Sequence, residues 1–231
     1  MVNAAFLAAM ENILRVYSLP YDEAYPVVSF DERPCFLIGD KVKGFEMKAG
    51  QIRKEHYEYE KKGSCCLLAA IEPLTGKRLA MVCDQRRKTE YAEFMQQLAS
   101  HFPNAKKIRL VQDNLNTHNA SSFYERFDAQ TAFELTNKFE FHYTPKSGSW
   151  LNMIETEFSV LARLCLKRRI PTKEILEEEV LAIFKERSDE KIKINWKFSI
   201  TDARRKMNRL YVKVNSCLLY TSDAADERSS V

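Results

Sequence analysis

RLVQDNLNTH, residues 109–118, carries the pattern that decides the fold: a short apolar run stops at an aspartate and gives way to a polar loop. VVSFDE, residues 27–32, repeats this pattern, and YTPKSGSWLNMIE, residues 143–155, leads from a turn into a helix start. Mg²⁺ prefers oxygen ligands and is held by a few carboxylates plus substrate phosphate oxygens. The three stretches therefore predict a metal-dependent site that acts on nucleic acid. Its carboxylates would be Asp31, Asp113 and Glu155.

Length and composition indicate one soluble globular domain. A chain of 231 residues can bury one sizeable core, with room for a small appendage. The net charge of +4, from 36 basic and 32 acidic side chains, is compatible with nucleic acid but does not by itself indicate it. Basic triplets could neutralise DNA phosphates or lie on solvated faces. They stand at residues 86–88, 167–169 and 204–206.

Cysteine and histidine spacing argues against a zinc site. The six cysteines contain no C-x-x-C pair, and the four histidines lack the spacing of metal ligands. Cys65 and Cys83 lie in strand patterns, where they are typical of small core residues in a reducing compartment. There is no signal peptide and no apolar run of membrane-spanning length. We therefore predict a cytoplasmic protein without a membrane partner.

Apolar periodicity predicts an α/β domain with a mixed sheet, because strands are grouped early and helices then dominate. Residues 44–62 lack a clear period and are expected to form an excursion or hairpin. The expected strands are 27–31, 64–71, 78–83, 108–111 and 139–143. The expected helices are 4–17, 89–102 (with Thr89 as N-cap), 121–127, 129–135, 150–166, 173–187 and 201–212.

The C-terminal tail loses all periodicity. CLLYTSDAADE, Cys217–Glu227, resembles the translation of a transposon-based sequencing-library adapter, and a short natural polar tail is the alternative. We therefore expect no functional residue in the tail. The chain is divided into a lead-in helix and linker (1–26), a catalytic domain with C-terminal helices (27–212) and a non-native or disordered tail (213–231).

Each aspartate also has a purely structural interpretation, as the cap of a turn after its strand. Glu32 is the neighbour of Asp31, but strand alternation sends the two side chains to opposite faces. Only one of them can therefore join Asp113. We choose Asp31, on the face of Val27 and Ser29, a choice that rests mainly on the resemblance given below.

Glu155 lies near a helix start, where a negative charge is favourable for structural reasons alone. Asn152 and Ser159 are expected on its face of the helix, whereas Glu157 should point away into solvent. Three adjacent carboxylates repel and raise one another's pKa. Two Mg²⁺ or Mn²⁺ ions would remove that repulsion; one would activate the attacking water or 3′-hydroxyl and the other would stabilise the leaving oxygen.

Further side chains are candidates for contacts with DNA or with the acidic residues. His118 could contact a phosphate or support Asp113, although a loop or partly buried histidine is the ordinary interpretation. Trp150 could stack on DNA or anchor the helix entry. Residues 56–62, HYEYEKK, could touch DNA, but exposed hairpins often have this composition. The remaining candidates are Asn114, Lys146 and Asn152.

Four blocks together resemble the catalytic domain of the IS630 family of bacterial insertion-sequence transposases. They are PVVSFDE, IRLVQDNLNTH, FHYTPKSGSWLNMIETEFSVLARLCLKRRIP and the W-x-F…DAR-x-K…LY pattern of residues 196–211. The resemblance runs from about Phe6 to Tyr211. This family belongs to the IS630/Tc1/mariner superfamily, whose fold is RNase H-like and whose active site is a D-D-E triad.

The resemblance implies that Asp31, Asp113 and Glu155 form the triad and bind the metal. The first aspartate would lie on the first strand, the second on the fourth and the glutamate on a later helix. The implied fold is an RNase H-like mixed sheet flanked by helices, with a helical C-terminal extension. The implied function is cut-and-paste DNA transposition, in which Mg²⁺-dependent hydrolysis at transposon ends precedes strand transfer, commonly at TA targets. The implied partners are double-stranded DNA and a second subunit, at the nucleoid of a bacterium.

Three features depart from the family pattern. Ser147 stands where members usually carry histidine, and Gln112 stands where they usually carry an apolar residue. The N-terminal helix-turn-helix region that reads DNA is absent, so we expect a fragment. Two alternatives stay open: a generic RNase H-like nuclease or resolvase, and an inactive remnant that binds DNA or full-length transposase.

Overall fold

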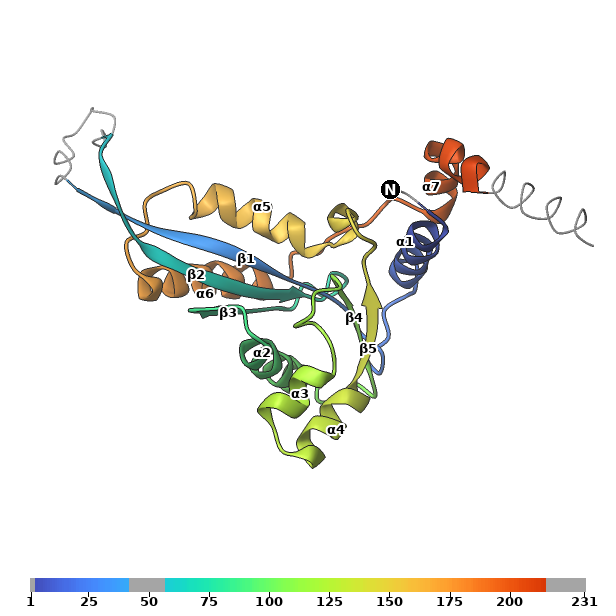
Figure 1. Ribbon diagram of the computed structural model, residues 1–231, viewed down its shortest axis with the longest axis horizontal. Coiled ribbons are helices and arrows are strands. Elements are labelled where there is room, and N and C mark those ends of the chain that lie inside the picture. The colour runs from blue at the N-terminus through green and yellow to red at the C-terminus, as the bar shows by residue number, and fades with distance from the viewer. Residues whose placement is uncertain (1–2, 42–56, 215–231) are drawn as a thin grey trace, which may run out of the picture.

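The computed structural model describes residues 3–41 and 57–214, which are built around a five-stranded mixed sheet of order β3-β2-β1-β4-β5 (Figure 1). The first three strands form an antiparallel meander, and the last two run parallel to the first part of β1. A parallel neighbour needs a crossover connection, which the intervening helices supply. The strands are β1 (Val27–Asp40), β2 (Tyr59–Ile71), β3 (Arg78–Cys83), β4 (Ile108–Gln112) and β5 (Phe139–Tyr143).

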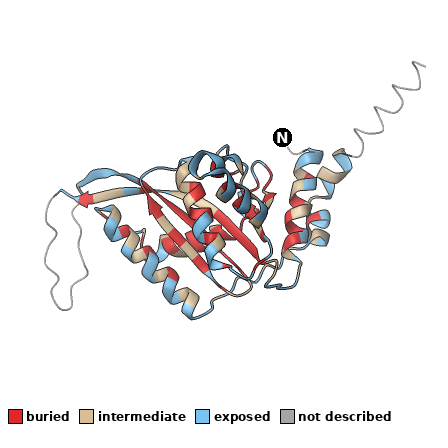
Figure 2. Cartoon of the chain, turned by 90° about the horizontal axis from the view of Figure 1, so that it is seen from below, coloured by how far each residue is buried: buried red, intermediate tan, exposed pale blue. Residues whose placement is uncertain are grey.

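Helices cover both faces of the sheet, and the buried residues line the strands between them (Figure 2). Successive strand side chains point to opposite faces. Phe30 and Leu68 therefore enter one core, whereas Cys35 and Leu67 enter the other. The first core is covered by α2 (Lys88–His101), α3 (Ser121–Arg126) and α4 (Ala129–Lys138). The second is covered by α5 (Ile154–Leu164) and α6 (Lys173–Asp189).

A third apolar cluster joins the first helix of the chain to the last ones. α1 (Ala4–Tyr17) lies beside α7 (Ile200–Lys206) at one end of the sheet (Figure 1). The Tyr17 hydroxyl donates to the Leu151 carbonyl at 2.8 Å. Arg204 forms an ion pair with Glu11 at 2.8 Å. α1 is therefore held against the sheet by residues from far along the chain.

The α/β class and the mixed sheet were predicted correctly, as were the bounds of β3 and β5. β1 runs beyond Asp31 to Asp40, because β2 continues to pair with it there. Thr89 was wrongly predicted as an N-cap: α2 begins at Lys88, and the Arg87 backbone N–H donates to Glu90 at 3.2 Å. β2 begins at Tyr59, five residues before the expected start, and so includes the end of the stretch expected to form an excursion or hairpin. Apart from the helices expected at 150–166 and 201–212, the remaining predicted elements appear with small shifts at their ends.

The prediction of one helix over residues 150–166 was wrong. A 3₁₀ turn, η1 (Ser149–Leu151), precedes α5, and the backbone of Asn152 between them is extended. The Asn152 side chain donates to the Phe30 carbonyl at 2.8 Å, which ties this break to β1. The last expected helix also breaks, at Met207, and residues 208–214 are helical again.

Some predictions lie outside the described residues, namely most of the expected excursion at 44–62 and the tail from residue 215 onward. Within the described part, the five cysteines are buried and have free thiols, as expected for Cys65 and Cys83. No helix among the described residues is long and apolar enough to cross a membrane.

Candidate active site

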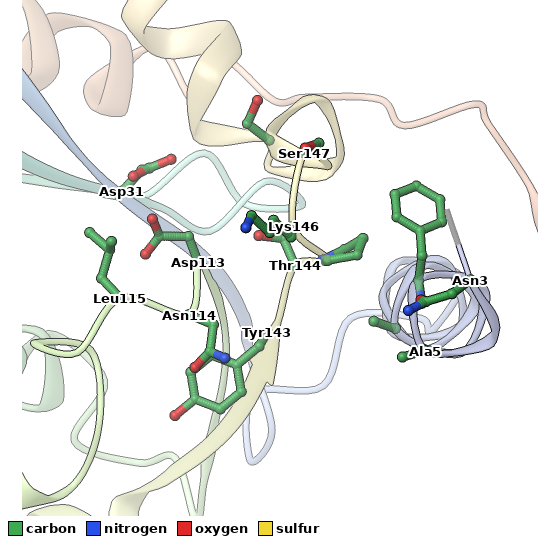
Figure 3. Close-up of a pocket in the computed structure, with 14 residues that line it drawn as sticks. Asn3, Ala5, Asp31, Asp113, Asn114, Leu115, Tyr143, Thr144, Lys146 and Ser147 are labelled. Carbon is green, nitrogen blue, oxygen red and sulfur yellow. The ribbon is translucent and has the colours of Figure 1, made fainter. Parts of the chain in front are cut away.

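Asp31 and Asp113 lie side by side because β1 and β4 are parallel neighbours. Ser29 pairs with Val111, and each aspartate stands two residues further along the chain, Asp31 still within β1 and Asp113 just beyond β4. β4 ends at Gln112 while β1 continues, and side chains beyond the carboxyl end of a parallel strand project into a crevice. Figure 3 shows the two carboxylates facing each other. Asp31 lies on the first strand, as predicted, whereas Asp113 is the first residue after the fourth strand, on which it was expected to lie.

The two aspartates line a cleft of about 740 Å³. Its walls are the start of α1, the loop after β4 and the turn after β5 (Figure 3). The participation of α1 was not predicted, because its sequence indicates only an amphipathic helix. The wall residues are Asn3, Ala5, Phe6, Ala9, Asn114, Leu115, Tyr143, Thr144, Pro145, Lys146, Ser147 and Ser149.

Asp31 is half-buried and has an unusual pKa. Burial raises the pKa of Asp31 to about 7, helped by the negative charges of Asp113 and Glu155 and opposed by the Glu32 backbone N–H, which donates to its Oδ1 at 2.8 Å. Its Oδ2 lies 3.3 Å from Asn152 Nδ2. The Asp31 carboxylate is therefore oriented by one contact on each of its oxygens. Its surroundings disfavour its negative charge.

Glu155 lies in the first turn of α5, as predicted, and is half-buried. Its charge contributes to the raised pKa of Asp31, but its side chain is not part of the cleft wall. Across residues 3–41 and 57–214, no three His, Cys, Asp or Glu side chains stand in an arrangement that already suits a metal ion. Of the three predicted carboxylates, Asp31 and Asp113 share the cleft, whereas Glu155 lies outside the cleft wall and acts on Asp31 through its charge.

His118 contacts Asp113 from beneath the cleft. Its side chain is fully buried, and its Nδ1 lies 2.5 Å from Asp113 Oδ1. Nε2 faces Glu32 Oε2 at 3.5 Å. Burial lowers the pKa of His118, but the contacts with the Asp113 and Glu32 carboxylates outweigh it and raise the pKa to about 9. A fully buried ring cannot reach a phosphate in the cleft, so this geometry favours its interpretation as a support for Asp113.

The prediction that Glu157 is solvated was wrong. Its side chain is fully buried and accepts hydrogen bonds from the guanidinium groups of Arg78 and Arg187. Helical spacing removes Glu157 from the Glu155 face, but it cannot reveal that β3 and α6 supply two arginines there. Glu157 therefore belongs to a buried ion cluster with Arg78 of β3 and Arg187 of α6.

The candidate DNA-contacting residues differ in their position relative to the cleft and in their exposure. Lys146 lies in the cleft wall, near Asp113 in Figure 3. Trp150 is 42% exposed and packs edge-on against Phe198 at 5.6 Å, so it both anchors η1 and presents a face to solvent. Arginines of all three basic triplets form ion pairs with acidic side chains, which favours the solvated-face interpretation of the triplets.

Two positions near the cleft have roles that the sequence did not indicate. Gln112, which stands where the resembling family usually has an apolar residue, is fully buried. It accepts a hydrogen bond from the Tyr91 hydroxyl and donates one to the His118 carbonyl, both at 2.9 Å. Ser147 has a φ of 64°, a conformation that favours glycine, in the turn that carries the Lys146 side chain. The neighbouring Gly148 is a signal for a turn here, but it does not show which residue takes the positive φ.

The sequence model of the family described as DDE superfamily endonuclease matches residues 26–177 of the chain. Among solved structures, the fold is similar to that of a Mos1 transposase paired-end complex with the left transposon end, at a TM-score of 0.55 and 14% identity over 83% of this chain and 59% of that one. It is also similar to the Mos1 mariner paired-end complex with Mn, at a TM-score of 0.54 and 13% identity over 94% of this chain and 63% of that one.

The isolated catalytic domain of Mos1 mariner transposase is similar as well, at a TM-score of 0.52 and 12% identity over 83% of this chain and 94% of that one. These likenesses identify the fold as RNase H-like, as predicted. The chain spans about six-tenths of the length of the two chains in the paired-end complexes. No curated protein sequence matches the chain.

Proposed function

Because the chain belongs to the DDE superfamily endonuclease family, we propose that it is the catalytic domain of a transposase, with Asp31, Asp113 and Glu155 as its acidic triad. The observation that carries this proposal is the placement of the two aspartates in one cleft, where the Glu155 charge contributes to the raised pKa of Asp31. A polynucleotidyl transfer site needs carboxylates gathered at the edge of a rigid sheet and open to a phosphodiester. The membership of the chain in the IS630 family stays part of this proposal.

The three carboxylates fit a divalent cation by their donor chemistry and by their shared electrostatic field. The raised pKa of Asp31 indicates a site where added positive charge is favourable. The likeness to the Mos1 mariner paired-end complex with Mn supports the same class of ion. Two Mg²⁺ or Mn²⁺ ions held by these residues would activate the attacking water or 3′-hydroxyl and stabilise the leaving oxygen. Because Glu155 is not part of the cleft wall, we expect ion binding to draw its side chain toward the aspartates.

Other residues of the chain would orient the reacting groups. Asn152 holds one oxygen of Asp31, and the Glu32 backbone N–H holds the other. Lys146 would attract a phosphate into the cleft, and Trp150 could stack on an exposed base next to it. In this proposal the side chains position DNA and the acidic residues, which is how electrostatic preorganisation acts.

The partners of the whole protein form a further part of the proposal. The substrate would be double-stranded DNA, at transposon ends and at the target, and two subunits would act on paired ends. The likeness to Mos1 paired-end complexes supports the DNA partner. In an IS630-like protein, a helix-turn-helix region would read the transposon ends.

Thermal unfolding with and without Mn²⁺ tests the proposed site. A cation that binds only the folded chain stabilises it by RT ln(1 + [L]/Kd), which is about 2.7 kcal/mol at a hundred times Kd. We expect this stabilisation in the parent and its loss in Asp31→Asn and Asp113→Asn. Glu134→Gln, at an exposed position of α4, is the matched control and should behave like the parent.

A DNA assay with terminal repeats as substrate then separates the alternatives. Metal-dependent cleavage followed by strand transfer supports a transposase, whereas cleavage alone indicates a generic nuclease. DNA binding without cleavage, together with no Mn²⁺-dependent stabilisation of the parent, would favour an inactive remnant and contradict the proposal.

A further inference from the structure

His118 sits between two carboxylates, and only one of them lines the cleft. Asp113 is on the cleft side, 37% exposed, and contacts His118 Nδ1 at 2.5 Å. Glu32 is on the opposite face of β1, only 5% exposed, and approaches Nε2 at 3.5 Å. Because an ionised carboxylate only accepts hydrogen bonds, Nδ1 donates to Asp113. One oxygen of Asp113 is therefore occupied, and the other stays available to the cleft.

The surroundings of His118 hold its ring in one orientation. The Tyr91 ring stacks on it at 4.9 Å and 24°, and the Phe30 ring packs edge-on at 5.3 Å. Its carbonyl accepts hydrogen bonds from Gln112 Nε2 at 2.9 Å and from the Tyr143 hydroxyl at 3.1 Å. The backbone and the ring are thus restrained independently, and a restrained donor fixes the direction of the carboxylate that it contacts.

Glu32 is itself fixed, since its Oε1 accepts a hydrogen bond from Arg86 at 3.0 Å. Its Oε2 is too far from Nε2 for a good hydrogen bond, so its contribution to His118 is electrostatic. Asp31 and Glu32 therefore have different environments: Asp31 lines the cleft, and Glu32 faces His118.

We propose that His118 is a positioning residue that fixes the Asp113 carboxylate for cation binding, with Glu32 and Gln112 holding His118 in place. This inference rests on the proposed function. It assigns no proton transfer to His118. Partners that orient a metal-binding side chain change metal affinity about ten- to a hundredfold when they are removed.

Two substitutions of His118 distinguish the contribution of Nδ1 from that of Nε2. The amide nitrogen of asparagine can occupy the place of Nδ1, whereas that of glutamine reaches the place of Nε2. We expect His118→Gln to weaken Mn²⁺ binding about ten- to a hundredfold and His118→Asn to weaken it far less. Gln112→Leu should fall between them, because it removes the donor to the His118 carbonyl but leaves the ring. His101→Gln, at an exposed position, is the matched control.

Mn²⁺ binding is measured on the full chain by electron paramagnetic resonance, after far-UV circular dichroism has shown that each variant is folded. If the parent binds Mn²⁺ and His118→Gln binds it equally well, positioning is refuted while the proposed function stands. If the parent itself does not bind Mn²⁺, the proposed function fails and the inference fails with it.

A second measurement avoids any variant that does not fold. In the metal-free parent, the ¹⁵N and ¹H spectra of the His118 ring should show a proton on Nδ1 in a strong hydrogen bond. A ring that carries no proton on Nδ1 in the parent would overturn the inference.

Discussion

Replacing Glu157 by glutamine should strongly destabilise the protein without changing the cleft. The Glu157 carboxylate accepts four hydrogen bonds: from Arg78 Nε and Nη2 at 2.8 and 2.9 Å, and from Arg187 Nε and Nη2 at 3.0 and 3.1 Å. Glutamine keeps the volume but turns one acceptor oxygen into a donor that faces guanidinium donors. The side chains of Glu157 and Arg78 are both fully buried, so water cannot replace the lost contacts.

Removing one partner of a buried ion pair costs about 3–5 kcal/mol, because an uncompensated charge stays buried. For a chain of this length each kcal/mol lowers the Tm by roughly 2–4 °C, so the expected decrease is about 6–20 °C. Urea and thermal denaturation of Glu157→Gln measure this loss. Glu155→Gln is the control, because Glu155 is half-buried and contributes to the raised pKa of Asp31.

The two glutamates should therefore give opposite results, although they are two residues apart. Glu157→Gln should lower the free energy of unfolding and leave the Mn²⁺ affinity of the folded protein unchanged. Glu155→Gln should leave stability nearly unchanged and weaken Mn²⁺ binding. A stability loss below about 1 kcal/mol in Glu157→Gln, the range of an exposed ion pair, would refute the reasoning. Equal losses of Mn²⁺ affinity in both variants would refute the separation of roles.

Three further results are expected. Burial raises the pKa of Glu157, but Arg78 and Arg187 outweigh it and lower the pKa below the ordinary value of 4.5. The stabilisation by Glu157 is therefore complete above pH 4.5 and is lost as the pH falls through the lowered pKa. In urea titrations across this acid range, the free energy of unfolding should depend less on pH in Glu157→Gln than in the parent. Ser147→Val should lower the Tm and Ser147→Gly should not, because the φ of 64° costs a β-branched residue about 1–3 kcal/mol; a higher Tm for the valine variant would contradict the strain. Tyr17→Phe should cost about 1–3 kcal/mol in chemical denaturation, because the Leu151 carbonyl loses its donor at 2.8 Å, and an unchanged stability would show that water replaces the hydroxyl.

Local sequence patterns predicted the elements better than they predicted the contacts between them. Arg78–Cys83 and Phe139–Tyr143 were predicted to the residue, because turn residues or a preceding helix bound these short apolar runs. The pattern of residues 109–118 predicted a strand that ends before an aspartate, and β4 has that form. Such signals need only neighbours in sequence, which is why one chain suffices to find them.

The environment of each acidic residue could not be predicted in this way. Glu157 is buried because Arg78 lies against it, and these residues are 79 positions apart in sequence. Helical periodicity gives the direction of a side chain but not the charge of the segment that packs there. Likewise, Gln112 interrupts an apolar strand, and only its contacts with Tyr91 and His118 explain why a polar side chain is satisfied there.

The contact between Glu11 and Arg204 has a consequence for biosynthesis. These residues are separated by 193 positions, yet their ion pair joins α7 to α1, whose start forms a wall of the cleft. A ribosome adds roughly 5–20 residues per second, so about ten to forty seconds pass between the emergence of the two residues. In the part of that interval that follows the synthesis of Asp113, the nascent chain contains both aspartates while Arg204 is not yet available to α1. The cleft wall that α1 forms can therefore be joined to α7 only after synthesis has passed Arg204.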